Sequence, residues 1–343
     1  MLGVAFATLL SCPGIAFEQR NMVFRLRGPY VFEYYRHHRE NFEIGAVAHW
    51  AHGWQHDLIL ITPPERIQQA DTAFAEEFLR MLENPPRTEP HQEDVAPRMA
   101  RLAFRVFRTI DWAHKLHEQL YDIMTDQRIS SDEKDAWIQR AIDHYLSETD
   151  VAFSVAPTEQ VLRRGGLHDA EWMHDYPMHW PRANDMFYAL HWWHIVVYEA
   201  QLLYPELEAQ QTALRRIAEL LHTEVLELPP NRMLFTRETA PRWARRCPEA
   251  ANVFDNLHMY HHMVYSILQS EEIEDKRSEL YRITDLMLNQ PGDRERAGEF
   301  EPPHPDMDPL VYAPWMYTGR GVEGEVLPEM HMDHSAPEEH EHH

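Results

Sequence analysis

The sequence is poor in cysteine, glycine and basic residues, and each shortage excludes a class of protein. Only Cys12 and Cys247 occur among 343 residues, so neither a disulfide framework nor a thiolate-rich metal site is expected. Only 12 residues are glycine, too few for the many tight turns of an all-β protein. Lys and Arg number 32 against 56 Asp and Glu, and the net charge of −24 argues against nucleic acid and anionic membranes as partners.

Several motifs that carry chemistry are also missing. The chain has no Gly-rich phosphate loop, no Gly-x-Ser-x-Gly elbow, no Cys-x-x-Cys-His and no His-Glu-x-x-His. Nucleotide enzymes and the hydrolases that use these motifs therefore have no support. No stretch reaches the ~18–20 apolar residues that a membrane-spanning helix needs, so we expect no transmembrane segment in the mature chain.

The two ends of the chain differ from its middle. Residues 2–10 form an apolar run, and small residues follow it, so residues 1–16 are predicted to be a signal peptide. Alternatively, Leu-Leu-Ser-Cys at 9–12 resembles a lipobox, which would place a lipid anchor on Cys12. Both interpretations predict a periplasmic or extracellular protein. Residues 293–343 are rich in proline and histidine and are predicted to form an irregular tail.

Histidine is the residue in excess, with 24 copies, and it recurs in the pattern His-x-x-His-x-x-x-(Tyr/His). Residues i and i+3 lie on one side of an α-helix, and i+7 returns to nearly the same direction, so each copy projects from one helix face. An acidic residue precedes each copy by three or six positions. The four copies are His49/His52/His56, His114/His117/Tyr121, His191/His194/Tyr198 and His258/His261/Tyr265.

The chain matches itself at an offset of about 142–144 residues, which indicates a tandem duplication. His49 and His52 match His191 and His194, and Ala-Pro-Arg-x-Ala-Arg occurs at both 96–101 and 240–245. The halves are expected at 20–150 and 160–292, and they are joined near Gly165 and Gly166.

Helical spacing of apolar residues runs through both halves, and the alternation typical of strands is nearly absent, so an all-α fold is predicted. Each half is interpreted as a four-helix-bundle-like unit. Pro97 at a helix start and the capping-box pattern of Ser130 and Glu133 support two of the boundaries. The helices are expected at 31–60, 65–83, 97–124, 131–147, 183–204, 206–227, 241–269 and 274–289.

The histidine pattern therefore falls on the first and third helix of each half. In an up-down-up-down bundle these helices face each other diagonally, which predicts one metal site per half. A competing arrangement gathers all four histidine helices at the centre. Neutral imidazole is a common ligand of Zn, Cu, Fe and Ni, and carboxylates can complete or support such a site. The candidate metal ligands are His49, His52, His56, His114, His117, His191, His194, His258, His261, Glu43, Asp111, Asp185 and Asp255.

These patterns predict an exported helical metalloprotein that binds Cu, Fe, Mn or Zn, and they leave redox or oxygen chemistry open. Tyr121, Tyr198 and Tyr265 would be redox-active or proton-donating neighbours of the metal, or simply core aromatics. A storage or delivery protein without catalysis is one alternative. A b-type haem protein is another, but bis-histidine ligation leaves the i+3 histidines unexplained, so it fits the pattern less well.

Overall fold

The computed structural model describes residues 32–87, 90, 92–300 and 308–312. The predicted signal peptide, Cys12 and most of the predicted tail lie outside these residues. Within them every regular element is helical, apart from an isolated bridge between Phe153 and Leu288. The all-α prediction is confirmed. None of the helices in the described part is long and apolar enough to cross a bilayer.

The first half folds close to the expected helices. The Ser130–Glu133 capping box forms at the start of the fourth helix, as predicted. The elements are α2 (Glu33–His37), α3 (Arg39–Ile61), η1 (Pro64–Arg66), α4 (Ile67–Glu83), α5 (Gln92–Val95), α6 (Pro97–Thr125) and α7 (Ser131–Ser147).

The second half adds short helices around the four that were expected. Gly165 and Gly166, in the predicted joint, both have positive φ, and a Cβ on Gly165 would meet Leu286 at 2.8 Å. The elements are α8 (Thr158–Leu162), η2 (Arg164–Asp169), η3 (Glu171–His174), α9 (Asp175–His179), α10 (Pro181–Leu203), α11 (Leu207–Leu220), η4 (Leu221–Val225), α12 (Thr236–Thr239), α13 (Pro241–Arg246), α14 (Pro248–Gln269), α15 (Lys276–Met287) and η5 (Arg294–Arg296).

Breaks in the helices occur at paired positions of the two halves. His38 and Trp180 have the same non-helical conformation, with φ and ψ of −130° and 49° in one and −122° and 56° in the other. Ala103 and Cys247 form a second such pair within the third helices. A proline after Trp180 and Cys247 disfavours the α conformation there, whereas no proline follows His38 or Ala103. Breaks shared between matched positions are what an internal duplication predicts.

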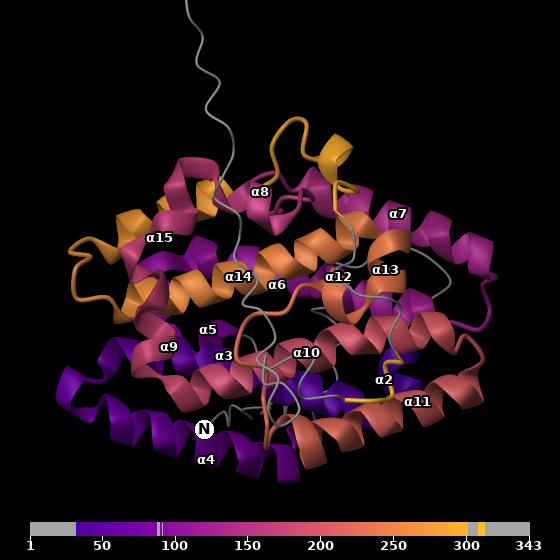
Figure 1. Ribbon diagram of the computed structural model, residues 1–343, viewed down its shortest axis with the longest axis horizontal. Coiled ribbons are helices and arrows are strands. Elements are labelled where there is room, and N and C mark those ends of the chain that lie inside the picture. The colour runs from indigo at the N-terminus through magenta and orange to yellow at the C-terminus, as the bar shows by residue number, and fades with distance from the viewer. Residues whose placement is uncertain (1–31, 88–89, 91, 301–307, 313–343) are drawn as a thin grey trace, which may run out of the picture.

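The helices of the two halves are packed together in layers. α4 contacts both α3 and α10, α11 contacts the same two helices, and α14 contacts both α3 and α6. In Figure 1, α4 and α11 run along one edge, α7 and α15 along the opposite edge, and α3, α6, α10 and α14 lie between them. The four helices that carry the histidine pattern are therefore covered on both sides.

Candidate metal centre

Nine histidines form one buried group, the central histidine cluster, to which α3, α6, α10 and α14 all contribute. The most exposed of these side chains, His49, shows only 6% of its surface to solvent. Placing so many polar rings in a core carries a cost that needs compensation. The members of the cluster are His49, His52, His56, His114, His117, His191, His194, His258 and His261.

Two ring pairs form within the halves. His49 of α3 and His114 of α6 have ring centroids 4.3 Å apart, and His191 of α10 and His258 of α14 are separated by the same distance. These pairs occupy matched positions in the sequence. The expectation that the first and third helices of each half bring their histidines together is met for these four residues.

Other contacts join the two halves. His52 of α3 lies 4.6 Å from His261 of α14, measured between ring centroids. The Tyr265 hydroxyl donates to the His52 carbonyl oxygen at 3.2 Å, and the Tyr121 hydroxyl donates to the His194 carbonyl oxygen at 2.9 Å. The rings therefore follow the competing geometry, with all four helices gathered at the centre, rather than one separate site in each half.

Many ring nitrogens in the cluster have no hydrogen-bond partner. Neither Nδ1 nor Nε2 is paired in His52, His114 and His261, and all six atoms are buried. A neutral imidazole has one N–H donor and one lone pair, and each buried group left unpaired costs about 1–3 kcal/mol. These nitrogens are therefore available to a ligand.

Backbone carbonyl groups hold three other rings in one orientation. Because a carbonyl oxygen only accepts, the nitrogen facing it must carry the proton. His56 Nδ1 donates to the His52 carbonyl at 2.7 Å, and His258 Nδ1 donates to the Phe254 carbonyl at 2.9 Å. His191 donates through Nε2 to the Leu234 carbonyl. Each bond leaves the opposite ring nitrogen with its lone pair, as a metal ligand requires.

Burial keeps the rings uncharged. It lowers the pKa of His56 to about 3 and that of His258 to about 4. Burial also lowers the pKa of His52, His114 and His261 well below the ordinary value, and a positive charge on a neighbouring ring would lower it further. Near neutral pH these side chains are neutral imidazoles, the form that binds transition metals.

The donor set fits a metal ion, although ring rotation is needed to close a site. In the described part of the chain no three His, Cys, Asp or Glu side chains already stand ready to hold one ion. With metal–nitrogen bonds of about 2.0–2.1 Å, two imidazoles on one tetrahedral ion have centroids roughly 5 Å apart. The centroids of His52 and His56 lie 4.6 and 5.1 Å from that of His261, close to that separation.

Two of the four predicted carboxylate ligands already have other partners. Glu43 is paired with Arg39 at 2.9 Å, one helical turn earlier. Asp255 accepts from the backbone N–H of Thr236 at 2.9 Å and from its hydroxyl at 2.7 Å. Both carboxylates are therefore engaged by groups other than the histidines, and their role as ligands stays a prediction. Asp111 and Asp185 are half-buried, and their role as ligands stays a prediction.

Buried carboxylates instead hold helix starts across the molecule. Asp57 accepts from the backbone N–H groups of Arg98 and Met99 at the start of α6. Its matched residue Glu199 accepts from Arg242 and Trp243 at the start of α13. Carboxylates are favourable there because the first N–H groups of a helix lack intrahelical partners. The sequence analysis did not predict that these carboxylates bind helix starts. The acidic residues at the matched positions 57 and 199 could have indicated it.

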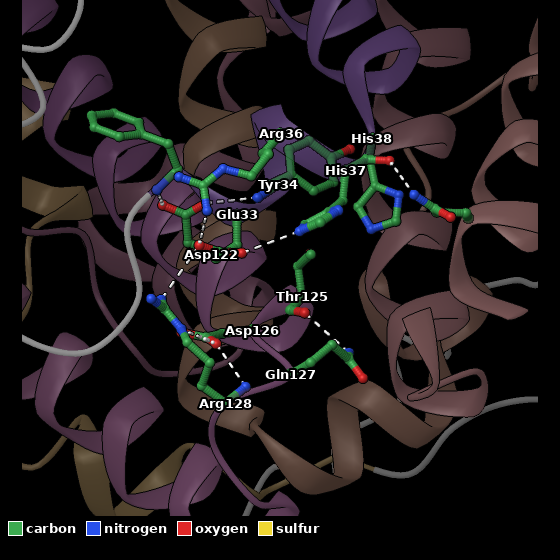
Figure 2. A network of polar contacts seen from close by, with 12 residues as sticks. Glu33, Tyr34, Arg36, His37, His38, Asp122, Thr125, Asp126, Gln127 and Arg128 are labelled. Carbon is green, nitrogen blue, oxygen red and sulfur yellow. Dashed lines mark hydrogen bonds and ion pairs between the residues drawn. The ribbon is translucent and has the colours of Figure 1, made fainter. Parts of the chain in front are cut away.

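A second polar network lies at the start of α2. Figure 2 shows Asp122 accepting from the backbone N–H of Tyr34 at 2.9 Å, beside the ion pairs of Glu33. His37 belongs to this network, since its Nε2 lies 3.3 Å from the Glu33 carboxylate. Arg128 also reaches Glu33, at 3.4 Å. The charged groups of this network are paired with one another or with backbone groups, unlike many ring nitrogens of the cluster.

Aromatic rings fill the space between the histidines, and the histidine pattern alone does not reveal them. Phe254 contacts His117 and His258, with centroid distances of 4.4 and 4.3 Å. Phe187 contacts His52 at 5.4 Å and His261 at 5.9 Å. These rings exclude water from the cluster, which strengthens any electrostatic interaction inside it.

Comparisons with protein-family models, with curated proteins and with solved structures find no match for this chain, so its chemistry has to be inferred from the cluster itself.

Proposed function

We propose that this protein binds transition-metal ions in the central histidine cluster. The observation that carries the proposal is the set of buried, unpaired ring nitrogens on His52, His114 and His261. A metal ion would accept the lone pairs of such rings and replace the hydrogen bonds that burial removed. When bound, it would supply Lewis-acid or redox chemistry in a water-poor core, and the residues of the chain would hold and orient it.

The composition of the cluster narrows the choice of metal ion. Its members offer only nitrogen, and two predicted oxygen ligands, Glu43 and Asp255, are engaged elsewhere. Imidazole suits Zn, Cu, Fe and Ni, whereas Mn prefers carboxylate and water oxygens. Among Cu, Fe, Mn and Zn, we therefore favour Cu, Zn and Fe over Mn.

A haem fits this core less well than a bare ion. The macrocycle must lie between its two axial histidines, and the paired rings of His49 and His114 are in direct contact instead, as are those of His191 and His258. A storage or delivery protein remains the second candidate function. The two metal-binding functions differ in the number of ions that each chain holds tightly.

We also propose that the chain is an internal duplication and that it is exported. The paired breaks at His38 and Trp180 and the matched helix-start contacts of Asp57 and Glu199 support the duplication. Export to the periplasm or cell exterior rests on the apolar run at 2–10 and the small residues after it.

The proposal is tested by the metal content of the protein purified without chelators or an affinity metal. Plasma mass spectrometry with a visible spectrum should find Cu, Zn or Fe in a fixed ratio to protein and no Soret band. Many weakly held ions per chain would instead favour storage. Protein without stoichiometric metal that also takes up none from Zn²⁺ or Cu²⁺ solutions would contradict the proposal, and buried water would then be expected between the rings.

A further inference from the structure

The central histidine cluster has two ends that the internal match relates residue by residue. In each end a tyrosine of one half donates its hydroxyl to a histidine carbonyl of the other half. The His56 end consists of His52, His56, His261 and Tyr265. The Tyr198 end consists of His194, Tyr198, His117 and Tyr121. The two ends differ in one matched pair, because His56 stands where the other end has Tyr198.

The His56 end offers three rings with available nitrogens. His52 and His261 are unpaired at both ring nitrogens, and His56 is unpaired at Nε2. The hydrogen bond from His56 Nδ1 to the His52 carbonyl places the proton on Nδ1, so Nε2 keeps its lone pair. All three side chains are at least 97% buried.

Two of the three separations within this group of rings are close to the roughly 5 Å expected for imidazoles on a shared ion. The ring centroid of His261 lies 4.6 Å from that of His52 and 5.1 Å from that of His56. The ring of Tyr265 lies against His56 and His261, at 4.8 and 5.0 Å. Its hydroxyl donates to the His52 carbonyl, so we assign this tyrosine a packing role beside the three histidines and not a role as a ligand.

The Tyr198 end has two unpaired ring nitrogens, His117 Nε2 and His194 Nδ1, whereas the His56 end has five. The Tyr198 hydroxyl lies 2.7 Å from His117 Nδ1, which removes that nitrogen as a metal ligand. Tyr198 is held between Tyr121 and Trp243, which stack on it at 4.5 Å each.

We propose that the His56 end holds the tightest metal ion of the protein through the imidazoles of His52, His56 and His261, and that the Tyr198 end holds no ion of comparable affinity. This inference rests on the proposed metal-binding function. Three imidazoles suit Zn²⁺ and Cu²⁺ and leave a fourth position for water or a small ligand. The difference between His56 and Tyr198 therefore decides which of the two matched groups binds a metal ion tightly.

The matched ends allow an exchange experiment on the full chain. His56→Tyr gives the His56 end the side chain of its counterpart, and Tyr198→His does the reverse. Tyr198→Phe is the control, because it removes the hydroxyl without adding a ligand. Each protein is stripped with a chelator, titrated with Zn²⁺ against a chromophoric competitor and dialysed, and its zinc content is then measured. Circular dichroism and thermal unfolding report whether each variant folds.

The wild-type protein should retain one tight Zn²⁺ ion per chain. His56→Tyr should weaken that ion on the order of 100-fold or more, since a direct ligand is lost. Tyr198→His should add a second tight ion, and Tyr198→Phe should leave the first ion unchanged. If His56→Tyr fails to fold, the gain in Tyr198→His and the loss expected in His261→Gln decide the question.

The results separate the two proposals. Wild-type protein that binds Zn²⁺ tightly while His56→Tyr and His261→Gln bind it equally well would overturn the assignment to this end and leave the metal-binding function standing. A wild-type protein that binds neither Zn²⁺ nor Cu²⁺ would overturn both.

Discussion

The two ends of the central histidine cluster are built on matched pairs of helices, α3 with α14 at the His56 end and α10 with α6 at the Tyr198 end, yet their donor atoms are used differently. At the His56 end, His52 and His261 keep all four ring nitrogens unpaired. At the Tyr198 end, a phenol held by stacking takes one nitrogen of His117. The comparison teaches that the count of histidines does not determine ligand capacity. What matters is how many ring nitrogens the protein leaves without a partner.

The largest difference between the ends is expected when one matched histidine is removed from each. His261→Ala should abolish tight Zn²⁺ binding, whereas His117→Ala should preserve it. At a free Zn²⁺ concentration about 100-fold above the dissociation constant, bound metal stabilises the wild type by about 2.7 kcal/mol, and only His261→Ala should lose this increment. Thermal unfolding with and without Zn²⁺ measures it.

His117→Ala serves as the matched control because it removes a buried histidine of the same cluster. It leaves the Tyr198 hydroxyl without its partner and should lower stability without metal by about 1–3 kcal/mol. Equal losses of zinc-dependent stabilisation in both variants would show that the ends are equivalent in binding.

A smaller, nearly symmetrical effect is expected from the matched carboxylates at helix starts. Asp57→Ala and Glu199→Ala should each cost about 1–2 kcal/mol, because each exposes unsatisfied N–H groups at a helix start. Glu199→Ala should cost the more, since Glu199 is fully buried and is also paired with Arg242 at 2.8 Å. Urea unfolding gives both values. Loss of bound metal in either variant would contradict their structural role.

Substituting the two tyrosines that join the halves should change stability by still smaller and more similar amounts. Tyr265→Phe and Tyr121→Phe each remove one buried hydrogen bond to a helix carbonyl, worth about 0.5–1.5 kcal/mol. Zinc affinity should change little, because neither hydroxyl is assigned to the metal. A large fall in affinity only in Tyr265→Phe would indicate that this phenol is itself a ligand at the His56 end.

A change that depends on pH, rather than on metal, is expected for Asp255→Asn. Burial raises the pKa of Asp255 to about 8, so the folded protein keeps its proton where the unfolded chain has released it. The stability from this group is present below about pH 4 and is lost as the pH rises to about 8. The asparagine variant should lack this dependence while binding metal normally. An unchanged pH profile would contradict the raised pKa, and lost metal would support Asp255 as a ligand.

The helical fold was predictable from local signals. Apolar spacing, Pro97 and the Ser130 capping box identified helices that the structure contains. The break at Cys247 follows from Pro248, which disfavours helix at the residue before it. The equivalent break at Ala103 carries no proline, so no local signal marked it.

The members of the histidine cluster were predictable, but their partners were not. Helical spacing defines which face a side chain occupies, and it does not say which helix covers that face. Hence the contact of His52 with His261 between the halves could be stated only as one of two alternatives. Three- and six-residue offsets also cannot distinguish a metal ligand from a partner of Arg39, as Glu43 is, or from a helix-start acceptor, as Asp255 is.

The most direct test is anomalous diffraction at the zinc absorption edge from crystals of the full chain grown with Zn²⁺. The account predicts a strong peak within bonding distance of ring nitrogens of His52, His56 and His261, and no peak of similar height beside His117 and His194. Fully occupied peaks only outside the cluster, or equal peaks at both ends, would contradict it.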